Sequence, residues 1–62
     1  MIVVMSPTAT EEDIAAVVEV IEDQGGETFV SRGKHRTLVG LVGDTERFMA
    51  LPIPGLPGVE EV

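Results

Sequence analysis

Two short segments of this chain carry hydrophobic residues on both faces, and they constrain the fold more than any other feature. Residues 2–5 (IVVM) are apolar throughout and stop at a Ser-Pro dipeptide, which disfavours a helix. Residues 36–42 (RTLVGLV) alternate so that Leu38 and Val42 face one way and the intervening valine and leucine the other. Strands with two apolar faces are typical of the inside of a sheet. We therefore predict that both segments are inner strands.

A helix is predicted between these strands, over residues 10–24. Thr10 is a suitable N-cap, Asp13 stands three residues later as its capping partner, and acidic residues fill the first turn, where the helix dipole favours them. Apolar residues then recur with the i, i+3, i+4, i+7 spacing of a single buried stripe. These are Ile14, Val17, Val18 and Ile21. Glycines 25 and 26 tolerate positive φ and end the helix.

A β-hairpin is predicted next. Residues 27–32 (ETFVSR) alternate and are rich in strand formers, and we expect them to pair with residues 36–42 around a turn at 33–35. The right-handed crossover of a strand–helix–strand unit then predicts that the first and third strands are parallel neighbours in a split βαβ arrangement.

The C-terminal third gives weaker signals. Residues 45–51 predict a short second helix, and the prolines at 52, 54 and 57 exclude regular structure until Gly58. The last four residues form at most a stub, so the fourth strand is missing or vestigial. The fold class is α+β, a β-α-β-β-α(-β) sandwich in one domain over residues 1–62. We expect a bare edge on the first strand and an uncovered sheet face, both suited to a homo-oligomer.

Composition excludes several classes of function. The chain has 62 residues and a net charge of −7, which disfavours nucleic acid and anionic membranes as partners. No apolar run approaches the roughly 20 residues of a membrane span. With no Cys and one His, neither a disulfide nor a Cys–His metal site is available. We expect a cytoplasmic domain without a metal or cofactor of its own, stabilised by oligomerisation or by a larger partner.

No set of residues points to catalysis. Ser31, His35 and Asp44 supply the residue types of a catalytic triad, but the first two flank a hairpin turn that has no nucleophile elbow. The carboxylates crowd a solvated helix face, and the glycine pair ends a helix rather than beginning one, as a phosphate-binding loop would. We therefore predict that this chain alone is not an enzyme.

A basic cluster stands out at the hairpin turn. Arg32, Lys34, His35 and Arg36 lie within five residues and carry +3 with His neutral, whereas the rest of the chain carries −10. One interpretation is an exposed hairpin tip that accepts charges freely. The other is a site that binds an anion or docks an acidic partner.

Three longer motifs resemble a known family. Residues 1–14 (MIVVMSPTATEEDI), 30–44 (VSRGKHRTLVGLVGD) and 57–62 (PGVEEV) resemble the N-terminal ferredoxin-like domain of bacterial 3-deoxy-7-phosphoheptulonate (DAHP) synthases. The resemblance runs from end to end without a gap. It implies a ferredoxin-like, ACT-like fold, whose fourth strand is expected after residue 62.

The resemblance also implies a role in allosteric feedback inhibition. In that family the small domain precedes a (β/α)₈ barrel with a divalent metal, which condenses phosphoenolpyruvate with erythrose 4-phosphate in the shikimate pathway of aromatic amino acid biosynthesis. The barrel is absent from these residues. Paired domains bind tyrosine or phenylalanine at their shared interface, and the ligand-facing positions are Phe29 and Ser31 here.

The role of Phe29 and Ser31 has more than one interpretation. Phe29 and Ser31 alternate on one face of their strand, which on composition alone also fits a core ring and an edge serine. Some family members have His in place of Phe29, so the resemblance implies that phenylalanine is at least as good an effector here as tyrosine. The alternative function is a ligand-free structural or docking module that uses the basic hairpin, residues 32–36.

Overall fold

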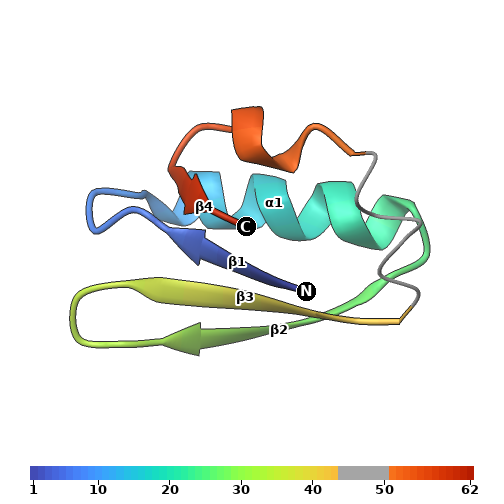
Figure 1. The fold of residues 1–62 in the computed structure, drawn as a ribbon, viewed down its shortest axis with the longest axis horizontal. Helices are drawn as coiled ribbons and strands as arrows, with labels where there is room; N and C mark the ends of the chain where they lie inside the picture. Colours follow the sequence, from blue (N-terminus) through green and yellow to red (C-terminus); the bar gives the residue numbers. More distant parts are fainter. Residues whose placement is uncertain (44–50) are drawn as a thin grey trace.

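Within residues 1–43 and 51–62, an antiparallel sheet carries one α-helix along one side (Figure 1). The structure, a computed structural model, describes residues 1–43 and 51–62. The strands are β1 (Ile2–Met5), β2 (Glu27–Arg32), β3 (Thr37–Val42) and β4 (Val59–Glu61), in the order β2-β3-β1-β4. The predicted α+β class and the predicted strands agree with this arrangement. The short helix expected over residues 45–51 lies outside the described residues, except for its last position.

The helix α1 (Glu11–Asp23) begins and ends as its sequence predicts. The Thr10 hydroxyl accepts a hydrogen bond from the Asp13 backbone N–H at 3.1 Å, and the Asp13 carboxylate accepts one from the Thr10 N–H at 3.0 Å. This reciprocal pair satisfies two backbone donors that a helix start leaves unpaired. At the other end Gly25 has a φ of +87° and donates to the Glu22 carbonyl at 2.9 Å. Glycine is favoured there because its φ is positive.

The direction of β3 differs from the prediction. β1 and β3 pair antiparallel, with Val3 opposite Val39, so the expectation of parallel neighbours is wrong. β2 and β3 are also antiparallel, because the hairpin reverses the chain between them. Because both are antiparallel to β3, β1 and β2 run parallel to each other, and β3 lies between them in the opposite direction.

The fourth strand is short, as predicted, and it closes part of an edge that was expected to be bare. β4 pairs antiparallel with β1, with Met5 opposite Val59 and Val4 opposite Glu61. The Ser6 N–H donates to the Gly58 carbonyl at 2.6 Å just beyond this pair. The expectations of a bare edge here and of a fourth strand only after residue 62 are therefore wrong.

A 3₁₀ turn, η1 (Ile53–Gly55), interrupts the proline-rich segment, where no regular structure was expected. Its hydrogen bonds run from the Gly55 N–H to the Pro52 carbonyl at 3.2 Å and from the Leu56 N–H to the Ile53 carbonyl at 3.0 Å. Neither donor is a proline, so the missing proline N–H groups cost this turn nothing. The expectation failed because prolines exclude longer helices but not a single 3₁₀ turn.

The core lies between the sheet and the side that carries α1 and η1 (Figure 1). Its buried side chains come from both inner strands, from one stripe of the helix and from the 3₁₀ turn. They are Val3, Met5, Ile14, Val17, Ile21, Val39, Leu41 and Ile53. No helix among the described residues has the length and hydropathy needed to cross a membrane.

Candidate functional site

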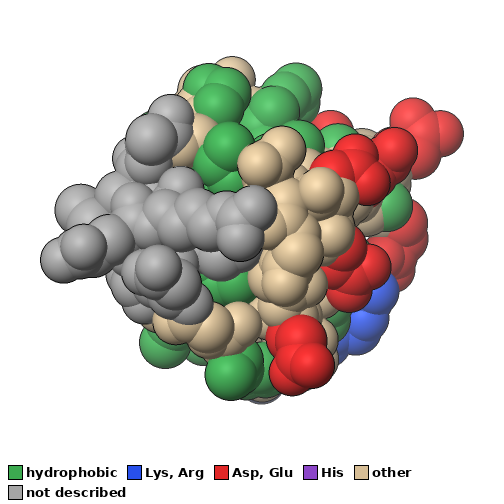
Figure 2. Space-filling view, turned by 90° about the vertical axis from the view of Figure 1, so that its right-hand side faces the viewer, with side chains coloured by type: hydrophobic (Ala, Val, Ile, Leu, Met, Phe, Trp, Pro, Cys, Tyr) green, Lys and Arg blue, Asp and Glu red, His purple; other side chains and the backbone are tan. Residues whose placement is uncertain are grey.

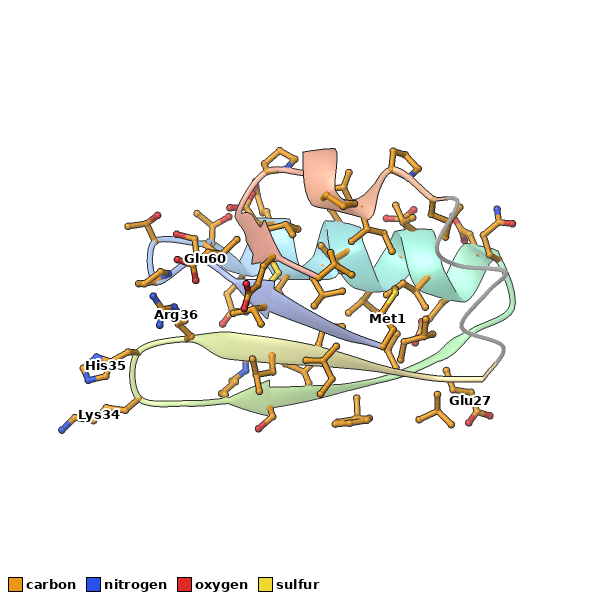
Figure 3. The ribbon with its side chains drawn as sticks, viewed as in Figure 1. Met1, Glu27, Lys34, His35, Arg36 and Glu60 are labelled. Atoms are coloured by element: carbon orange, nitrogen blue, oxygen red, sulfur yellow. The ribbon has the colours of Figure 1, made fainter. Side chains whose placement is uncertain are left out.

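Among the described residues, the face of the sheet opposite α1 leaves several large apolar side chains exposed. Since Val3 and Val39 are buried towards α1, their strand neighbours point the other way. We call this surface the open face. It consists of Ile2 and Val4 of β1, Glu27, Phe29 and Ser31 of β2, and Leu38, Gly40 and Val42 of β3. Among the described residues no helix or strand lies over it, and Glu27 is seen to point away from α1 (Figure 3).

Three large hydrophobic side chains are exposed on the open face. Phe29 and Val42 are each 55% exposed, and Ile2 is 53% exposed. Ile2 and Phe29 lie on either side of Gly40, since both are opposite it in the sheet register. The alternative interpretation of Phe29 as a core ring is therefore wrong. Its ring lies on the surface beside other apolar side chains.

The Phe29 ring covers Gly40. A Cβ built on Gly40 would lie within 2.7 Å of three ring atoms, Cζ, Cε1 and Cε2. Because three atoms at the far end of the ring crowd this one point, the ring presents its face to Gly40 and lies across the sheet. Gly40 is accordingly buried although no element of the described chain covers this face.

Ser31 lies on the same face of β2, two residues after Phe29 and opposite Leu38. Its side chain is exposed. The structure thus brings the two residues that the sequence singled out onto one surface, as their alternation predicts. It adds Gly40, Ile2 and Val42, which the sequence analysis missed. Only the register shows that Ile2 and Val42 share this face, whereas a glycine inside a strand is itself a signal of close approach.

The basic residues of the hairpin do not form a free cationic surface. Arg32 makes a two-pronged ion pair with Glu11 of α1, in which both nitrogen–oxygen distances are 2.7 Å. Arg36 makes another with Glu60 of β4, with Nε 2.7 Å and Nη2 3.3 Å from the two carboxylate oxygens (Figure 3). Such paired geometry is the strongest form of Arg–carboxylate contact, although exposure weakens both pairs. Two of the three formal charges of the cluster are therefore balanced within the domain.

Lys34 and His35 remain at the hairpin tip, where both side chains project away from the sheet (Figure 3). The structure does not bring them together with Phe29 and Ser31.

Acidic side chains gather along one side of the view in Figure 2, while hydrophobic ones gather at its top. Within the described residues no three His, Cys, Asp or Glu side chains are placed to hold a metal ion. Asp44, the third member of the catalytic set considered from sequence, lies outside the described residues.

Comparison with known proteins assigns the family. The model of the DAHP synthase ferredoxin-like domain matches residues 1–62 of this chain. The chain belongs to this family. The ferredoxin-like fold implied by the sequence motifs is thereby confirmed.

Two matches to phospho-2-dehydro-3-deoxyheptonate aldolase from Thermotoga maritima, one by sequence and one by structure, show how this ferredoxin-like domain compares with whole proteins of the family. A phospho-2-dehydro-3-deoxyheptonate aldolase is 40% identical over 62 residues, which are 100% of this chain and 18% of the relative. The crystal structure of a phospho-2-dehydro-3-deoxyheptonate aldolase (DAHP synthase) superposes with a TM-score of 0.67 at 35% identity. That match covers 98% of this chain and 19% of the other. The chain thus spans less than one fifth of the relatives that it matches.

Proposed function

We propose that this ferredoxin-like domain is the regulatory, effector-binding part of a DAHP synthase, with the catalytic barrel of that enzyme as its partner. The effector is phenylalanine or tyrosine, bound on the open face between two copies of the domain. One observation carries the proposal: Phe29 and Ser31 are both exposed on the same face of β2, on a surface that no described helix or strand covers. The divalent metal of such an enzyme belongs to the barrel and has no role here.

The side chains of β2 suit an aromatic amino acid. Glu27, Phe29 and Ser31 project from the same face of the strand, at intervals of roughly 7 Å. The Phe29 ring can stack with the ring of the ligand, a contact that contributes about 0.5–1.5 kcal/mol beyond the area that it buries. Glu27 supplies a carboxylate for the ammonium group of the ligand, and Ser31 supplies one hydroxyl for hydrogen bonding.

A second copy of the domain completes the site. Small-molecule sites bury roughly 70–90% of their ligand, whereas an open sheet face contacts one side only. The exposed Ile2 and Val42 provide apolar surface around Phe29 for a partner. A ligand held between two such faces binds the paired state better than the single domain, and so shifts the population towards pairs. Pairing at this face then restricts access to the barrel.

The docking module is the weaker candidate. Its cationic residues Arg32 and Arg36 already pair with Glu11 and Glu60, so an acidic partner would have to compete with these exposed ion pairs. This module predicts salt-sensitive binding of a partner and no response to amino acids.

Sedimentation velocity of the chain with and without phenylalanine tests the proposal. The wild-type chain is expected to shift towards a dimer when phenylalanine is added, and Phe29→Ala is expected to lose this response. Val62→Ala is the matched control, because Val62 is 51% exposed and lies outside the strands. It should respond like the wild type. A wild-type chain whose sedimentation ignores both phenylalanine and tyrosine at millimolar concentration contradicts the proposal.

The residue at position 29 also predicts which effector is preferred. A phenylalanine ring offers no hydrogen-bond partner to a phenolic hydroxyl, so Ser31 alone serves that group. Phenylalanine should therefore bind at least as tightly as tyrosine, and Phe29→His should shift the preference towards tyrosine. Calorimetric titration of both chains with both amino acids measures this shift. Clear preference of the wild-type chain for tyrosine would count against the assignment.

A further inference from the structure

Gly40 is a glycine that its backbone does not require. Among the described residues the glycines with positive φ are Gly25, Gly43 and Gly58, and Gly40 is not one of them. A side chain at this inner-strand position would strengthen β3, because glycine weakens a strand that it interrupts. The reason for glycine must therefore be the space above it.

That space is filled by the far end of the Phe29 ring. A Cβ on Gly40 would lie within 2.7 Å of Cζ, Cε1 and Cε2, closer than real Cβ atoms approach anything. Phe29 is opposite Gly40 in β2, and Ile2 is opposite it in β1. The ring thus lies in a gap of the open face that only a residue without a side chain leaves free.

We propose that Gly40 is a positioning residue: it lets the Phe29 ring lie flat across the sheet and so fixes the aromatic surface against which the effector stacks. This inference rests on the proposed function and names the residue that orients its site. Aromatic pairs prefer offset-stacked or edge-to-face arrangements, so the tilt of one ring decides how a second ring can pack. A tilted Phe29 ring would also project into the space that the ligand occupies.

The Gly40→Ala variant tests the orientation of the Phe29 ring without removing the ring. The clash would involve only the end of an exposed side chain, which can swing outwards without moving the backbone. Gly40→Ala therefore keeps Phe29 and the sheet while it tilts the ring. Gly55→Ala is the matched control, because nothing lies within 4 Å of a Cβ at that position and its φ is not positive.

The experiment combines two measurements on the wild type, Gly40→Ala and Gly55→Ala. Proton NMR without ligand reports the ring position, since a ring that lies face-on over Gly40 shifts the Gly40 α-protons upfield. Calorimetric titration with phenylalanine reports affinity. We expect the upfield shift in the wild type and Gly55→Ala, and about two- to tenfold weaker phenylalanine binding in Gly40→Ala only. Urea unfolding of all three chains checks that the loss is not a loss of folding.

The outcomes distinguish this inference from the proposed function. Wild-type affinity for phenylalanine in Gly40→Ala would overturn the role of Gly40 and leave the effector site in place. Absence of the upfield shift in the wild type would overturn the ring orientation itself. If the shift is present and the wild type binds no aromatic amino acid, the proposed function fails and the positioning role of Gly40 fails with it.

Discussion

The 3₁₀ turn η1 should contribute strongly to stability, because it places Ile53 in the core. The sequence alone predicts that this proline-rich segment is irregular. Ile53 is only 1% exposed and lies in the same buried cluster as residues of α1 and the inner strands. Truncating a buried isoleucine to alanine costs about 2–5 kcal/mol. A chain of this length has a free energy of unfolding of roughly 3–9 kcal/mol. Ile53→Ala should therefore remove at least about a fifth of the total stability.

Urea unfolding followed by circular dichroism measures the loss. With a slope of about 1 kcal/mol per molar urea, a loss of about 3 kcal/mol lowers the midpoint by roughly 3 M. Ile2→Ala is the matched control, since Ile2 is 53% exposed on the open face and should lose less than about 1 kcal/mol. If Ile53→Ala fails to fold, Ile53→Val should still lose about 0.5–1.5 kcal/mol. Equal losses for Ile53→Ala and Ile2→Ala would refute the packing of η1 against the core.

Further variants test the helix ends, the hairpin ion pair and the site. Thr10→Ala removes one half of the capping box and should lower the free energy of unfolding by about 1 kcal/mol, measured in urea. Gly25→Ala should cost about as much, roughly 1 kcal/mol, because its φ of +87° is unfavourable for alanine. Arg36→Ala breaks the pair with Glu60 and should cost less than about 1 kcal/mol, with the loss shrinking at 1 M salt. Glu27→Gln should weaken phenylalanine binding up to about fivefold by calorimetry without changing stability. An unchanged affinity would exclude Glu27 as the partner of the ammonium group.

The local signals of the sequence predicted most of the fold. The capping pair Thr10 and Asp13 and the glycines after the helix gave both ends of α1, and alternation gave the hairpin. The direction of β3 was mispredicted because the crossover rule concerns β1 and β2, whereas the hairpin turn decides how the strand between them runs. The pairing of β4 with β1 depends on contacts between the two ends of the chain. No local pattern encodes such contacts.

The candidate site was only half predictable, for a similar reason. Phe29 and Ser31 share a face because alternation along one strand places them there. Gly40 lies on the same face only because of the register of β2 against β3, and this register cannot be predicted from the sequence alone. The basic cluster was mispredicted for a different reason: its residues lie within five positions of the sequence, but Arg32 and Arg36 pair with carboxylates on different elements.

A titration of the isotope-labelled chain with phenylalanine, tyrosine and tryptophan, followed through its backbone amide resonances, tests the central claim most directly. We expect saturable shifts with phenylalanine at Phe29, Ser31 and Gly40, and smaller ones at the hairpin tip around Lys34. A well-dispersed spectrum that ignores all three amino acids would contradict an effector site on the open face.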